Sequence, residues 1–103
     1  MNRGEVRWYK FSHPDKKRPV LILTRGSVLS YLGEVTIAPI TSSIRGIPSE
    51  VELSPADGMR QACAINCDHL QTVSKGKLGA LITTLTPEKL SDVARAICFA
   101  IEL

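Results

Sequence analysis

The chain is a succession of short β-type runs, each ended by glycine, proline or serine, with one long helical pattern at its C-terminal end. The runs have the lengths of ordinary strands and are rich in Val, Ile, Leu and Thr. They cover Glu5–Tyr9, Val20–Thr24, Val35–Ala38, Glu50–Leu53, Ala62–Asp68 and Gly79–Leu85. This arrangement predicts a mainly β (α+β) fold, a small antiparallel β-barrel with a C-terminal α-helix.

We expect the C-terminal helix to run from Pro87 to about Ile101. Thr86 can cap it, and Pro87 suits its first position. Apolar residues at spacings of three and four predict one buried stripe, formed by Leu90, Val93, Ala94, Ile97, Cys98 and Ile101. A short helical turn is also expected within Ser27–Leu32.

The length of 103 residues leaves room for one domain, residues 1–103. With 44% hydrophobic and 22% charged residues, the composition is that of a globular domain. Apolar runs such as Val20–Leu23 are far shorter than the ~20 residues that cross a bilayer, and the N-terminal residues lack the apolar region of a secretory signal. We therefore expect no membrane association and a cytoplasmic location.

Three cysteines, an odd number at low density, argue against a disulfide framework and for reduced thiols. Cys63, Cys67 and His69 stand at even separations and would share one face of a strand. A metal would need a fourth ligand, which only Cys98 or the distant His13 could supply, and the spacing fits no standard zinc pattern. The sequence therefore predicts two small core thiols and no metal site.

Basic residues are concentrated in the first quarter of the chain. Residues 1–25 contain seven Lys or Arg and two acidic residues, a net charge of +5, whereas the remainder carries −2. A polyanion would be drawn to this end of the molecule. The alternative is that these side chains are ordinary solvated residues of loops and edge strands.

Side chains capable of chemistry are confined to four places: residues 11–19, residues 38–43, Arg45, and residues 66–69. The chain has no glycine-rich phosphate loop, nucleophile elbow, His-Glu zinc helix or RNA-recognition aromatic pair. Asn66 and Asp68 would lie together on one strand face. They either belong to a site or cap the following turn.

Four short segments follow one another in an order that spans nearly the whole chain. They are Arg3-Gly4-Glu5-Val6 with Trp8, Arg18-Pro19-Val20-Leu21-Ile22, Pro39-Ile40-Thr41-Ser42, and Cys67-Asp68-His69-Leu70-Gln71-Thr72, followed by Gly79 and the terminal helix. In this order they resemble the MazF/PemK-type toxin endoribonucleases. The resemblance implies an SH3-like barrel, a homodimer that binds single-stranded RNA, and inhibition by a cognate antitoxin.

The resemblance also implies cleavage of single-stranded RNA at short sequences without a metal or other cofactor, with the 2′-hydroxyl of the substrate as nucleophile. It assigns the catalytic centre to Arg18 and Thr41, whose guanidinium and hydroxyl groups can donate to phosphate oxygens. Asp68 matches a family aspartate and is expected to orient the substrate, with His13 or Lys17 as proton donor to the leaving oxygen. The expected RNA contacts are Lys16, Lys17, Ser42, Ser43, Arg45 and Asn66.

Asn66 and Gln71 stand where some members carry basic residues, so the acid and base assignments stay open. Two other function classes are also open: a non-catalytic gyrase-binding toxin of the CcdB type and an SH3-like interaction module. The chain ends Ala100-Ile101-Glu102-Leu103 rather than Trp-Gly-Ile, which disfavours the first. Its five aromatic residues do not cluster as a peptide groove requires, which disfavours the second.

Overall fold

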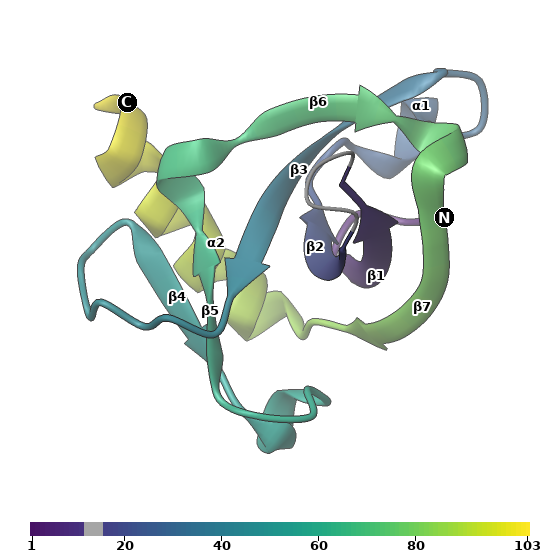
Figure 1. Cartoon of the computed structure of the whole chain (residues 1–103). Coiled ribbons are helices and arrows are strands. Elements are labelled where there is room, and N and C mark those ends of the chain that lie inside the picture. The colour runs from purple at the N-terminus through teal and green to yellow at the C-terminus, as the bar shows by residue number, and fades with distance from the viewer. Residues whose placement is uncertain (12–15) are drawn as a thin grey trace.

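The computed structural model, which describes residues 1–11 and 16–103, is organised around strand β3 (Glu34–Thr41). One edge of β3 pairs with β2 (Lys17–Ile22), and its other edge pairs first with β6 (Gln71–Ser74) and then with β5 (Cys63–Asn66). β1 (Glu5–Lys10) and β7 (Leu78–Thr84) extend the sheet beyond β2, and β4 (Glu50–Leu53) extends it beyond β5. All pairings are antiparallel. Figure 1 shows β6 and β7 arching round β1, β2 and β3, so that the sheet curls into a small barrel.

Both faces of this sheet are packed against other side chains. In β2, Leu21 belongs to the larger hydrophobic cluster, whereas Val20 and Ile22 belong to a smaller cluster on the opposite face. The larger cluster also contains Val93 and Ala96 of helix α2 (Pro87–Ile101), so the C-terminal helix covers that side. Burial on both faces of β2 explains why Val20, Leu21 and Ile22 form an apolar run rather than an alternating one.

The mainly β class and the C-terminal helix predicted from the sequence are confirmed. α2 begins at Pro87 and ends at Ile101, and Thr86 Oγ1 accepts a hydrogen bond from the Lys89 N–H at 3.2 Å. The short helical turn is α1 (Gly26–Leu29). Three single turns of 3₁₀-helix complete the described part: η1 (Pro55–Asp57), η2 (Cys67–His69) and η3 (Lys75–Lys77). In the part of the chain that the structure describes, no helix has the length and apolarity needed to cross a membrane.

The strand expected at Ala62–Asp68 is shorter than predicted. β5 ends at Asn66, whose side-chain oxygen accepts the Asp68 N–H at 3.0 Å and caps turn η2. The sequence prediction also missed β6. This strand is only four residues long and three of them are polar, so its pairing with β3 has little local signal.

The buried face of α2 differs from the predicted stripe. Val93 and Ala96 are buried, and Leu90, Ile97 and Ala100 pack partly against the same cluster. Three residues of the predicted stripe, Ala94, Cys98 and Ile101, are instead exposed. The helix packs on β4 and η2, and its buried residues are Val93 and Ala96. The apolar residues to either side of these two therefore reach the solvent.

Candidate functional site

Arg18 belongs to β2, and Thr41 belongs to the neighbouring strand β3. These strands pair from Ile22 with Ile37 to Val20 with Pro39, so Arg18 and Thr41 each stand two residues beyond the last pair of this ladder. Both residues line the same groove. The two residues predicted to form the catalytic centre therefore line one groove, although they are 23 positions apart in the sequence.

Two prolines explain why the sheet opens at this point. Pro19 and Pro39 lack a backbone N–H, so neither can donate to the ladder between β2 and β3. The described pairing of these strands ends at Val20 with Pro39, and from Ile40 onward β3 pairs with β5 on its other edge. The ends of β2 and β3 thus leave a concave space between them.

The groove at this position, which we call the Arg18 groove, has a volume of about 740 Å³. That volume lies within the ~300–1,000 Å³ range of small-ligand sites. Its polar lining comes from three segments: Arg18 of β2, Thr41 and Ser42 at the end of β3, and Arg60 and Gln61 in the chain between η1 and β5. Its apolar lining includes Trp8, Pro19, Met59, Leu81 and Ile82.

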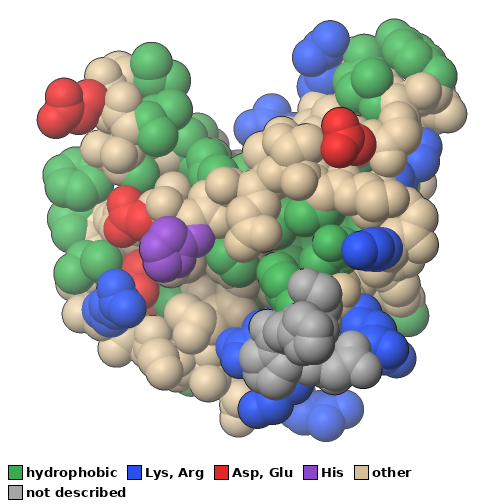
Figure 2. Space-filling view, turned by 45° about the horizontal axis from the view of Figure 1, so that its top comes forward, with side chains coloured by type: hydrophobic (Ala, Val, Ile, Leu, Met, Phe, Trp, Pro, Cys, Tyr) green, Lys and Arg blue, Asp and Glu red, His purple; other side chains and the backbone are tan. Residues whose placement is uncertain are grey.

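The charge lining the Arg18 groove is positive. Arg18 and Arg60 are both exposed, and no acidic side chain is among the described residues that line it. Figure 2 shows Lys and Arg side chains gathered on the lower right of one face, whereas most acidic side chains lie on its left. An anionic ligand is therefore favoured in the groove.

The Thr41 hydroxyl is held ready to donate a hydrogen bond. Its Oγ1 accepts the backbone N–H of Ser43 at 3.1 Å, which fixes the side chain across the strand end. Because the hydroxyl is the acceptor in this contact, its own proton stays available to a ligand. A guanidinium and a hydroxyl donor on facing strand ends can together bind the oxygens of one phosphate group.

Asp68 and Asn66 do not line the Arg18 groove. Asp68 Oδ2 accepts a hydrogen bond from the buried Ser49 hydroxyl at 2.5 Å. Asn66 caps η2, and its Nδ2 lies 3.0 Å from Nδ1 of His69. These contacts correspond to the turn-capping alternative for Asn66, and they place both side chains at the end of β5 away from Cys63, the β5 residue that lines the groove.

The other predicted RNA contacts are exposed but lie outside the lining of the groove, apart from Ser42. Lys16 and Lys17 lead into β2, directly before Arg18. Ser43 and Arg45 follow Thr41 on the connection to β4, where the Arg45 N–H donates to the Glu50 carboxylate at 2.9 Å. His13 lies outside the described residues.

Sequence reasoning missed Trp8, Arg60 and Gln61 as residues of the groove. Trp8 was noted only as part of the family resemblance, and Arg60 and Gln61 lie between two strands with no motif around them. The only signal available was that Met59-Arg60-Gln61 follows Gly58, a turn glycine, at the entry to a strand. They share a groove with Arg18 through the tertiary structure, and spacing along the chain does not encode this placement.

Two of the three cysteines, Cys63 and Cys67, are core residues, as predicted. Cys63 and Cys67 are buried, and burial raises the pKa of both thiols, that of Cys67 to about 11, with the nearby carboxylates of Asp57 and Asp68 adding to the effect. Cys98 is exposed on α2. Within residues 1–11 and 16–103 no group of three or more His, Cys, Asp or Glu side chains is placed to hold a metal ion.

Comparisons with known proteins agree with this geometry. The model of the family described as "PemK-like, MazF-like toxin of type II toxin-antitoxin system" matches residues 2–101. The chain is 42% identical over 89 residues to "Endoribonuclease MazF3" of Mycobacterium tuberculosis, which covers 86% of each chain. It superposes on the solved "Mycobacterium tuberculosis toxin MazF-mt6" with a TM-score of 0.88 and 37% identity, covering 96% of this chain and 97% of the other. A mycobacterial "Endoribonuclease in complex with its cognate antitoxin" shares the fold, with a TM-score of 0.89, 24% identity, and coverage of 100% and 96%.

Proposed function

The chain belongs to the PemK-like, MazF-like toxin family of type II toxin-antitoxin systems, and on that premise we propose that it is an endoribonuclease that cleaves single-stranded RNA in the Arg18 groove. The observation that carries the proposal is that Arg18 and Thr41 line one groove, which no described acidic side chain lines. This arrangement supplies donors to a phosphodiester and a positive field that attracts the backbone of a nucleic acid. The family match favours this function over a gyrase-binding toxin.

A peptide-binding module of the SH3 type is also disfavoured by the aromatic residues. Such a module binds proline-rich peptides in a groove lined by exposed aromatic rings. Here Tyr9 is buried and packs edge to face with Phe11, with ring centroids 4.7 Å apart. This pair serves the smaller hydrophobic cluster.

The reaction needs no nucleophile from the protein. The 2′-hydroxyl oxygen attacks the adjacent phosphorus, the bond from phosphorus to the 5′-oxygen breaks, and the products carry a cyclic phosphate and a 5′-hydroxyl. The planar Arg18 guanidinium can donate two parallel hydrogen bonds to phosphate oxygens, and the Thr41 hydroxyl can donate to a third. Donors positioned in this way stabilise the negative charge that develops on the pentavalent phosphorane.

Proton transfer requires a base for the 2′-hydroxyl and an acid for the leaving oxygen. His13 and Lys17 stay our candidates for the acid, and Lys17 immediately precedes Arg18 in β2. Asp68 stays our candidate for orienting the substrate. Its hydrogen bond to Ser49 sets it at the turn after β5, so it would meet a part of the RNA beyond the scissile phosphate.

Cleavage of a long single-stranded RNA in excess EDTA tests the proposal. We expect defined cuts that leave a 5′-hydroxyl and a cyclic phosphate. An RNA with deoxyribose at the cleaved position should resist, because its internal nucleophile is missing. Normal cleavage of the deoxyribose substrate would refute the mechanism, and a requirement for added metal would refute metal-independent catalysis.

We further propose that a cognate antitoxin inhibits the enzyme by occupying the Arg18 groove. The family belongs to toxin-antitoxin systems, and an acidic disordered segment would compete with RNA for Arg18 and Arg60. Such an inhibitor should weaken RNA binding less as salt concentration rises.

A bacterial toxin of this kind meets its RNA in the cytoplasm, which is the location we expect.

We also propose that the protein forms a homodimer. Three apolar side chains at the end of α2 are exposed in the single chain: Phe99 by 60%, Ile101 by 52% and Leu103 by 85%. Burying them against a second copy would remove apolar surface from water. Light scattering at micromolar concentrations should give twice the 11.3 kDa chain mass. A monomer mass across that range would contradict the dimer.

A further inference from the structure

We propose that the 54–61 loop, which runs from Ser54 to Gln61, forms the specificity wall of the Arg18 groove, and that Arg60 and Gln61 read the edge of a nucleobase next to the scissile phosphate. The inference deepens the proposed function and rests on it. Neither residue belongs to the segments that carry the family resemblance. Both are brought to the groove by the fold alone.

The composition of the groove suits a base better than a second phosphate. A nucleobase has two flat apolar faces and a polar edge, whereas a phosphate presents oxygens on every side. Trp8, Met59 and Ile82 supply an apolar surface, and aromatic rings such as the Trp8 indole stack on bases of any identity. Polar donors are confined to the strand ends and the loop, so a base on the apolar surface would direct its edge toward the loop.

Arg60 and Gln61 have the hydrogen-bonding groups that edge recognition needs. An arginine presents a fork of donors, and a glutamine amide presents both donors and an acceptor. These two side chains pair with the edges of bases in protein complexes with nucleic acids, and single-stranded RNA exposes such edges fully. Both are exposed, and within the described residues neither side chain makes a hydrogen bond or an ion pair, so their polar groups can bind a ligand.

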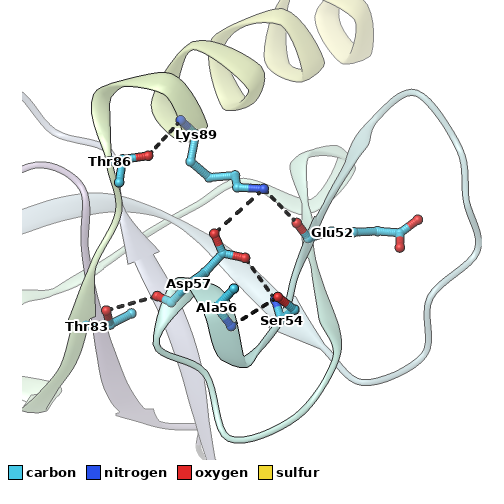
Figure 3. Close-up of polar contacts among 7 residues, drawn as sticks. All are labelled: Glu52, Ser54, Ala56, Asp57, Thr83, Thr86 and Lys89. Atoms are coloured by element: carbon cyan, nitrogen blue, oxygen red, sulfur yellow. Dashed lines mark hydrogen bonds and ion pairs between the residues drawn. The ribbon is translucent and has the colours of Figure 1, made fainter.

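Hydrogen bonds within the 54–61 loop and to β7 hold this loop in place (Figure 3). Asp57 Oδ2 accepts the Ser54 N–H at 2.9 Å, and Ser54 Oγ accepts the Ala56 N–H at 3.2 Å, which closes the loop into a capping box. The Asp57 carbonyl accepts a hydrogen bond from Thr83 Oγ1 of β7 at 3.0 Å. The backbone held by these hydrogen bonds ends shortly before Arg60. The Arg60 and Gln61 side chains therefore extend from a rigid segment.

Gly58 adds a second constraint on the same loop. Its φ of +96° lies in the left-handed region, which favours glycine. A Cβ at this position would meet Thr83 Oγ1 at 2.3 Å, so the loop lies directly on β7. A loop held this closely against a strand cannot adapt its shape to a different ligand, so it can discriminate between ligands.

Mapping of all cut ends on a long RNA of varied sequence tests the inference. The purified full-length chain and its Arg60→Ala, Arg60→Lys and Gln61→Ala variants are compared in excess EDTA. We expect each variant to lose base preference at one position beside the cut, with preferences elsewhere retained. Cleavage at the best sites should fall about tenfold to a hundredfold, the discrimination typical of a good bidentate contact.

Arg60→Lys is the decisive variant because lysine keeps the charge but not the planar fork. Arg95→Ala, on the exposed face of α2, is the matched control and should keep both rate and preference. A uniform loss of rate in Arg60→Ala, with native preference in Arg60→Lys, would show a charge contact and overturn base reading. Complete loss of cutting by a folded Arg60→Ala would place Arg60 in the chemistry and overturn it as well. If the unmodified chain cuts no RNA, the proposed function itself fails.

Discussion

The ammonium of Lys89, in the first turn of α2, lies 3.8 Å from Oδ1 of Asp57 and also donates to the Glu52 carbonyl at 3.4 Å (Figure 3). Asp57 is thereby joined to the C-terminal helix as well as to β7. The helix begins at this point because Thr86 caps it, so a local signal of the sequence fixes the position of Lys89. Through Asp57, the start of α2 helps to hold the 54–61 loop.

Asp57→Ala should lower both stability and sequence specificity. The change removes the capping box and the ion pair, and loss of an N-cap contact costs about 1 kcal/mol, which corresponds to a decrease in Tm of roughly 4–8 °C for a small domain. We expect cut-site mapping to show relaxed preference at the position affected by Arg60→Ala. Asp92→Ala, which removes an exposed carboxylate of α2 paired with Arg95, is the control. Native specificity in a destabilised Asp57→Ala would show that the tether serves stability only.

Gly58→Ala should destabilise the protein by about 1–3 kcal/mol. Alanine is strained at a φ of +96°, and its Cβ would lie 2.7 Å from the Cβ of Thr83. Urea unfolding measures the loss. Gly26→Ala is the comparison, because no atom lies within 4 Å of a Cβ added there. An unchanged midpoint in Gly58→Ala would contradict the close contact between the loop and β7.

Arg18→Ala and Thr41→Val should each reduce RNA cleavage by roughly 10²–10³, the usual effect of removing one positioned donor from a transition state. Both side chains reach the solvent or the groove, so the unfolding midpoint should change little. Thr41→Ser keeps the hydroxyl and should retain most activity. Single-turnover rates on one mapped site provide the measurement. Near-native rates in the folded Arg18→Ala and Thr41→Val variants would place the chemistry elsewhere.

The cysteines should differ in reactivity. Burial raises the pKa of Cys67 to about 11 and also raises that of Cys63, so at pH 7 to 8 both are buried, protonated thiols. Cys98 is exposed. A thiol reagent should therefore modify one cysteine per native chain and three after denaturation, and peptide mapping should identify Cys98. Rapid modification of Cys67 in the native protein would contradict its burial in the core.

Glu5 should make stability depend on pH in the acid range. Burial raises the pKa of this carboxyl, but the hydrogen bond from Arg7 at 2.8 Å and a backbone hydrogen bond at Asn2 outweigh burial and hold its pKa below the usual value. The stabilisation is present above the unfolded pKa of about 4.3 and is lost as pH falls through the lower folded pKa. Glu5→Gln should flatten this part of the profile in urea unfolding between pH 2 and 6. An unchanged profile would contradict the contribution of Glu5.

Much of the fold could be predicted because its signals are local. The helix from Pro87 to Ile101 follows from a cap, a proline and a periodic stripe, all within residues 86–101. β4 was predicted with its observed bounds. β6 was not predicted, because a short polar strand is stabilised by its partner β3 rather than by its own residues.

The candidate site divides in the same way. Arg18 and Thr41 could be identified because each stands in a segment that resembles the family, Arg18 directly before Pro19 and Thr41 two residues after Pro39. Asn66 and Asp68 share a residue pattern with a site, but the end of β5 directs them to the turn and to Ser49. The sequence alone determined the helix, since a short-range pattern encodes it, and through the family resemblance it assigned Arg18 and Thr41 as the candidate catalytic pair. Only the tertiary structure decided that Arg60 and Gln61 line the same groove as Arg18, because this placement depends on the curl of the sheet and on how the 54–61 loop is held against β7 and α2.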